Sequence, residues 1–88
     1  MDDQELLEKL ESLAEGLGYE VRYQSTGGHS GKCVLRGQKV AIVDSQQTVR
    51  VRVDSLAQIL AEEDLERVYL PPELRLLIET YRAGMDEA

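Results

Sequence analysis

The sequence predicts a small α+β domain in which helices pack on one face of a three-stranded antiparallel sheet. Apolar residues show helical spacing at both ends of the chain and alternate as in strands in its middle, which gives the order helix, strand, strand, strand, helix, helix. The 88 residues suffice for one compact domain, which we place at residues 1–82. Such a short chain has a thin core and leaves no room for a deep cleft.

The first expected helix runs from Asp3 to Leu17. Acidic residues crowd its first turn, where they complement the helix dipole, and Gly18 is the favoured residue just past its end. Apolar residues line one face of this helix at helical spacing. They are Leu6, Leu7, Leu10, Leu13, Ala14 and Leu17.

Three strands should follow. Residues 19–24 alternate apolar and polar, and residues 25–31, with three glycines, form a flexible loop. Residues 32–36 and 39–44 then form two strands joined tightly around Gly37, as in a hairpin.

Alternation along these strands predicts two different sheet faces. The face toward the core should carry Val21, Cys33, Leu35, Val40 and Ile42. The other face would be basic with an apolar strip. Its members are Arg22, Lys32, Val34, Arg36, Lys39, Ala41 and Val43, of which Val34, Ala41 and Val43 form the strip.

Residues 47–62 fit two patterns at their start. Residues 48–54 alternate as in a strand, whereas the longer apolar spacing fits a helix with Ser45 or Thr48 as N-cap. We predict the helix, because three valines lower helix propensity only slightly. Pro72 then suits the first turn of a last helix, and the tail at 83–88 should fray.

The net charge of −7, with a pI near 4.6, is unevenly distributed. Residues 1–20 carry −6, residues 21–54 carry +4 and residues 55–88 carry −5. The acidic total disfavours non-specific binding to nucleic acid or membranes, and no apolar run is long enough to span a bilayer. The single cysteine cannot form an internal disulfide, which indicates the cytoplasm.

The glycine-rich stretch at residues 27–33 is similar to a phosphate-binding loop. The match fails at Thr26, where such a loop needs glycine, and at Cys33, where it needs serine or threonine. We therefore expect a flexible loop, with the binding of a small anion or a partner as the alternative.

His29 and Cys33 are four residues apart, which suits two zinc ligands or a nucleophile and its base. There is no other histidine or cysteine, so a closed metal site would need carboxylates or a second copy of the chain. The helix predicted at 47–62 also lacks the His-Glu-x-x-His pattern of metal-dependent proteases. We therefore predict no catalytic activity and no cofactor.

Residues 6–82 resemble a group of small uncharacterised bacterial proteins. The resemblance is carried by the glycine loop, a Cys-x-Leu strand with a tight hairpin, and the segment Asp-Leu-Glu-x-Val-Tyr-Leu-Pro-Pro. The matching positions are Gly28, Cys33, Gly37, Asp64, Tyr69, Pro71 and Arg75. This resemblance implies kinship and favours the helix at 47–62, but it implies no activity.

The leading hypothesis is a cytoplasmic, non-enzymatic protein-interaction module that forms a homodimer or joins a larger complex. The alternative is a regulator that holds a small anion or an acidic segment through the basic face and loop 27–32. Metal binding through His29 and Cys33 is a third hypothesis. The candidate binding residues are Arg22, Gly28, His29, Lys32, Val34, Arg36, Lys39 and Val43.

Overall fold

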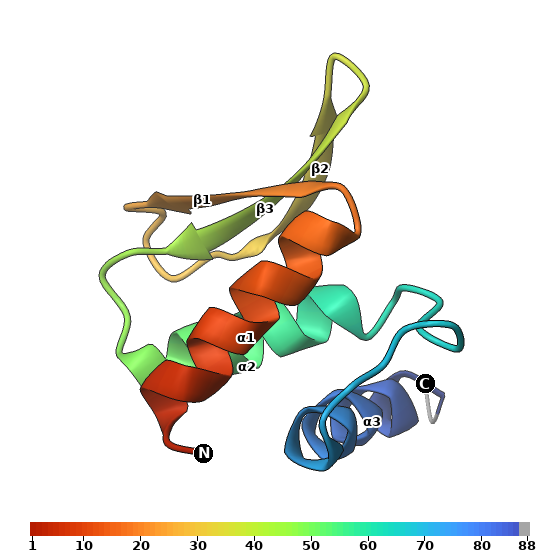
Figure 1. Cartoon of the computed structure of the whole chain (residues 1–88). Helices are drawn as coiled ribbons and strands as arrows, with labels where there is room; N and C mark the ends of the chain where they lie inside the picture. The colour runs from red at the N-terminus through yellow and green to blue at the C-terminus, as the bar shows by residue number, and fades with distance from the viewer. Residues whose placement is uncertain (87–88) are drawn as a thin grey trace.

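The computed structural model describes residues 1–86 and has the predicted order of helices and strands. The elements are α1 (Asp3–Gly16), β1 (Tyr19–Gln24), β2 (Gly31–Leu35), β3 (Gln38–Asp44), α2 (Val49–Leu60) and α3 (Pro72–Asp86). The sheet forms one layer with α1 and α2 beneath it, and α3 lies on the side of α2 remote from the sheet (Figure 1). No helix in the described range is long and apolar enough to cross a membrane.

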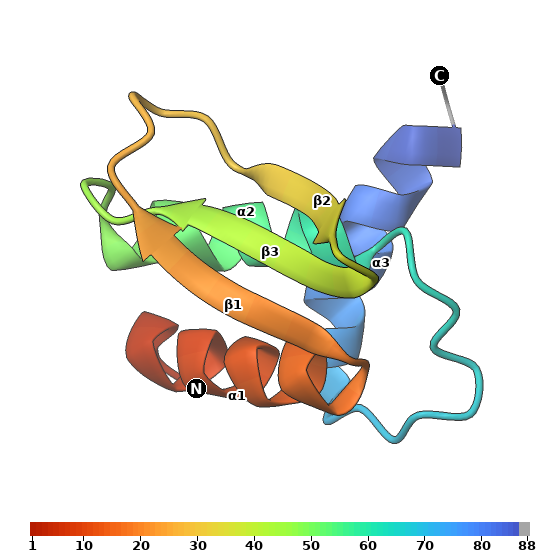
Figure 2. The ribbon, with the colours of Figure 1, turned by 90° about the horizontal axis from the view of Figure 1, so that it is seen from above.

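The sheet is mixed, so the prediction of a fully antiparallel sheet is wrong. The strand order is β1-β3-β2; β1 pairs with β3 in parallel, and β2 pairs with β3 antiparallel (Figure 2). The loop at residues 25–30 connects β1 to β2 across two strand spacings, about 10 Å, and a loop of that many residues spans this distance easily. The strand with the longest apolar run, β3, thereby takes the central place, where both of its edges are paired.

The predicted faces of β3 are also reversed: Val40 and Ile42 lie on the side away from Ala41 and Val43, although Val40 is fully buried there, as predicted. Tyr19, Val21, Ala41 and Val43 share one side of the sheet through the β1–β3 register, and they belong to or pack against the core that the helices cover. Ala41 and Val43 are therefore buried, and the predicted surface strip of Val34, Ala41 and Val43 does not exist. Residues 40–43 are all apolar, so alternation alone could not indicate which set faces the helices.

The helix ends follow the sequence signals. The Thr48 side chain accepts a hydrogen bond from the Val51 amide, which confirms that the segment around residues 47–62 is a helix. Gly18 lies just past α1 with a φ of 93°, a conformation that glycine adopts without strain. α3 starts at Pro72 as predicted. It continues to Asp86, beyond the point at which we predicted a tail, and residues 87–88 lie outside the described range.

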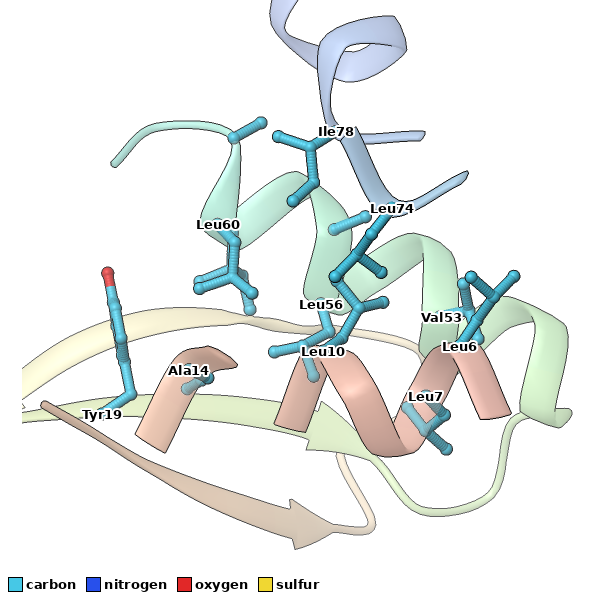
Figure 3. Close-up of a cluster of buried hydrophobic side chains, with 14 of the residues drawn as sticks. Leu6, Leu7, Leu10, Ala14, Tyr19, Val53, Leu56, Leu60, Leu74 and Ile78 are labelled. Carbon is cyan, nitrogen blue, oxygen red and sulfur yellow. The ribbon is translucent and has the colours of Figure 1, made fainter. Parts of the chain in front are cut away.

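The core lies between the sheet and the three helices. Leu10 of α1, Leu56 of α2 and Leu74 of α3 are almost fully buried and meet at its centre (Figure 3). The Arg82 guanidinium donates to the carbonyl oxygens of Ala61 (3.2 Å) and Glu63 (2.8 Å), which ties α3 to the end of α2. These contacts fix the position of α2 beneath β2 and β3.

Candidate functional site

The glycine loop folds around the side chain of Asp44, the last residue of β3. Gly27 and Gly28 have positive φ angles of 70° and 95°, which lets the chain turn sharply. The Asp44 carboxylate accepts hydrogen bonds from the amide of Gly28 (2.6 Å), the amide of Gln46 (3.0 Å) and the side chain of Gln47 (3.2 Å). The Gly28 amide, which could otherwise bind an external anion, thus already binds an internal one.

Asp44 is 1% exposed, yet its hydrogen bonds stabilise the charged form. The Gln46 amide, the Gln47 side chain and the Gly28 amide together hold the pKa of Asp44 below its usual value, against the opposing effect of burial. The amide of Asp44 in turn donates to the Ser30 hydroxyl (3.2 Å). Asp44 is not among the predicted site residues; the available signal was an acid that directly follows an apolar strand and faces a glycine loop.

Two of the four predicted basic site residues meet on the helix side of the sheet. The ammonium group of Lys32 lies 3.0 Å from the Glu62 carboxylate, and that of Lys39 lies 2.9 Å from the Glu63 carboxylate, just beyond the end of α2. The Tyr19 hydroxyl also donates to Glu63 (3.1 Å), and Lys39 lies 4.5 Å from the centre of the Tyr19 ring. The charges of both lysines are therefore balanced within the molecule.

This cluster shifts the ionisation of two of its members. Burial, followed by the hydrogen bond to Glu63, raises the pKa of Tyr19 to about 12. The hydrogen bond from Lys39 is the largest of the effects that lower the pKa of Glu63. Glu63 therefore stays charged and Tyr19 stays neutral around neutral pH.

The other two basic residues lie elsewhere. Arg22 projects from the opposite side of β1, where its guanidinium is 2.8 Å from the Glu20 carboxylate. Arg36 occupies the β2–β3 turn with a φ of 52°, next to Gly37 at 81°. The structure thus brings Lys32 and Lys39 together but does not unite the four residues in one basic site.

The apolar candidates have opposite environments. Val43 is 1% exposed and belongs to the core, whereas Val34 on β2 is 65% exposed. Leu35, which was predicted to face the core, is 46% exposed and follows Val34 on the same strand. β2, an outermost strand of the sheet, therefore presents two consecutive apolar residues to solvent.

A hollow of about 420 Å³ lies beside the first residues of β2. One wall is residues 28–32, which includes His29, and the other is formed by α2 and the residue that follows its cap. The side chains of the second wall are Ser55, Gln58, Ile59 and Glu62. This hollow was not predicted, because it depends on the packing of α2 beneath the β2 edge.

His29 and Cys33 line different hollows. Cys33, which is partly exposed, borders a smaller one of about 250 Å³ together with Tyr19, Lys39 and Glu63. Within the described residues, no group of three or more His, Cys, Asp or Glu side chains is placed to hold a metal ion. The geometry provides no observation that favours metal binding through this pair.

Comparisons of this chain with protein-family models, with curated proteins and with solved structures give no match. The resemblance to a group of small bacterial proteins therefore stays a prediction.

Proposed function

We propose that this protein is a non-enzymatic protein-interaction module that binds an extended protein segment along the free edge of β2. The observation that carries the proposal is the exposure of Val34 (65%) and Leu35 (46%) on an outermost strand. A strand added to such an edge gains main-chain hydrogen bonds and covers the apolar side chains at the same time.

The lack of protection along β2 supports this proposal. Edge strands usually avoid unwanted pairing through charged side chains, proline or a bulge. β2 contains no proline, and its only charged residue, Lys32, is drawn toward α2 by Glu62. An edge left in this state is stable in the cell when a partner covers it.

The alternative, a regulator that binds a small anion, receives less support. The Gly28 amide already serves the Asp44 carboxylate, and Lys32 and Lys39 are paired with acids of the same chain. We expect no change in melting temperature with inorganic phosphate, nucleotides or small carboxylates in a thermal-shift titration. A saturable stabilisation by any of these anions would restore the anion hypothesis.

The proposal is tested by photo-crosslinking in the native host. A diazirine-bearing amino acid replaces Val34 at the β2 edge, and a matched variant carries the same probe in place of Arg22 on β1. We expect discrete protein adducts from position 34 that are absent from position 22. No adduct from position 34, or the same adducts from both positions, would contradict the proposal.

As part of the same proposal we place the module in the cytoplasm, where its one cysteine stays reduced.

A further inference from the structure

We infer that the segment paired with the β2 edge is β2 of a second copy of this chain, in antiparallel orientation with Cys33 opposite Cys33. This inference rests on the proposed function and names its partner. It follows from three features of β2: the direction of its free backbone groups, the order of its side chains and the hollow beside it.

The hairpin determines which backbone groups of β2 are free. Arg36 and Gly37 both have positive φ angles, as in the two-residue turn that matches strand twist, and this turn closes on a hydrogen-bonded pair, here Leu35 with Gln38. Along the hairpin, hydrogen-bonded pairs alternate with pairs that are not hydrogen-bonded. The amide and carbonyl groups of Lys32 and Val34, which belong to the second kind, therefore point away from β3. These two residues form the edge that a new strand meets.

Only a few registers let two β2 strands join these groups around a two-fold axis. With the axis at Cys33, Lys32 of each copy faces Val34 of the other, and each such pair exchanges both of its hydrogen bonds. With the axis at Lys32, two ammonium groups would face each other, which is destabilising. With the axis at Val34, Lys32 would face Arg36, which is also cationic and lies in the turn beyond the strand.

The favoured register also fills the hollow beside β2. Because the second strand runs in the opposite direction, its Arg36 passes the start of β2, where the hollow of about 420 Å³ opens next to Glu62. Arg36 of the second copy then meets an acidic side chain, and its Val34 lies beside Lys32 and is covered. Leu35 of the second copy faces Gly31, which has no side chain to exclude it.

The area of contact limits the affinity. β2 has five residues, so the interface is at the small end of specific protein contacts, and we expect a dissociation constant in the micromolar range. The dimer should therefore form at high protein concentration and dissociate on dilution. The net charge of −7 makes the two copies repel each other. This repulsion opposes association most at low salt, because it is screened least there.

The first test uses the single cysteine as a reporter of register. Mild oxidation with diamide should join the two Cys33 thiols; they lose two protons and two electrons, which reduce diamide to its hydrazine. A control variant, Cys33→Ser with Arg22→Cys, carries its only thiol on the same sheet face at the β1 edge. We expect disulfide-linked dimer to form about tenfold faster with Cys33 than with the control, because apposed thiols react without a diffusive encounter.

The second test uses sedimentation equilibrium under reducing conditions. Val34→Pro removes the edge-facing amide without removing a hydrogen bond to β3, and Val34→Thr keeps both that amide and the branched side chain. We expect the native chain and Val34→Thr to dimerise and Val34→Pro to stay monomeric with an unchanged circular dichroism spectrum. If Val34→Pro does not fold, Val34→Lys provides the second variant, since it places like charges opposite each other and should weaken the dimer.

The outcomes separate this inference from the proposed function. A native chain that stays monomeric at all concentrations, or equal oxidation rates for Cys33 and the β1 control, would overturn the second copy as partner. If photo-crosslinking from position 34 then captures a different protein, the interaction module stands with another occupant. If it captures nothing, both proposals fail.

Discussion

The two edges of the sheet belong to the same layer but are built differently. β1 carries an ion pair, Glu20 with Arg22, on one side, and on the other side the Tyr23 hydroxyl donates to Glu11 of α1. β2 carries Val34 and Leu35, both exposed, and its lysine is paired with Glu62, just beyond the end of α2. The two edges therefore differ in charge as much as in apolar surface, and both differences favour β2 as the edge that binds in our proposal.

The largest effect should come from a contrast between the centre of the sheet and its β2 edge. Val43→Asp buries an unpaired carboxylate beside the core and should destabilise the fold by about 4 kcal/mol, whereas Val34→Asp should change stability by about 0.5 kcal/mol or less. Urea unfolding of dilute, monomeric protein measures both. Equal losses would show that Val34 is part of the core and would remove the contrast.

A smaller effect should come from the loop that connects the two edges. The pKa of Asp44 is lowered in the folded state, so its carboxylate stabilises the fold above its unfolded-state pKa of about 3.9, and this stabilisation is lost as the pH falls through the folded-state value. Asp44→Asn should therefore reduce stability at neutral pH and flatten the loss of stability in acid.

Denaturant unfolding at several pH values tests this expectation, with Glu8→Gln on the exposed face of α1 as the control for a carboxyl-to-amide change. An Asp44→Asn variant with the same acid profile as the native chain would show that the loop does not depend on this carboxylate.

The smallest effect should come from the acid that holds the β2 lysine. Glu62→Gln removes the ion pair of Lys32, whose free charge then disfavours pairing at the β2 edge. The substitution also removes the acid that we expect to meet Arg36 of the second copy. Surface ion pairs are weak, so dimerisation should weaken by only about two- to threefold. Glu20→Gln, which breaks the ion pair on β1, should leave the dissociation constant unchanged; an equal effect of both variants would contradict the assignment to β2.

Local features of the fold were predictable from the sequence. The leucine spacing of α1, the cap of α2 and the proline at the start of α3 each act within one or two turns. All three predictions are confirmed, and of the two predicted caps, Ser45 and Thr48, the helix uses Thr48. The Arg36–Gly37 hairpin is equally local.

The remaining features depend on contacts between distant residues. No local pattern in the sequence indicates that β1 pairs with β3 instead of β2. Because residues 40–43 are all apolar, alternation does not indicate which side of β3 faces the helices. The neutralisation of Lys32 and Lys39 needs the two glutamates that follow α2, more than 20 residues away in the chain. A basic face that looked like an anion site in the sequence is therefore neutral where those lysines lie.

The most direct test of the central claim is backbone amide exchange at Lys32 and Val34, measured by NMR at low and high protein concentration. If β2 of a second copy covers this edge, exchange at both amides should slow as the concentration rises, while exchange along the outer edge of β1 stays constant. Exchange at Lys32 and Val34 that is fast and independent of concentration would contradict pairing at the β2 edge.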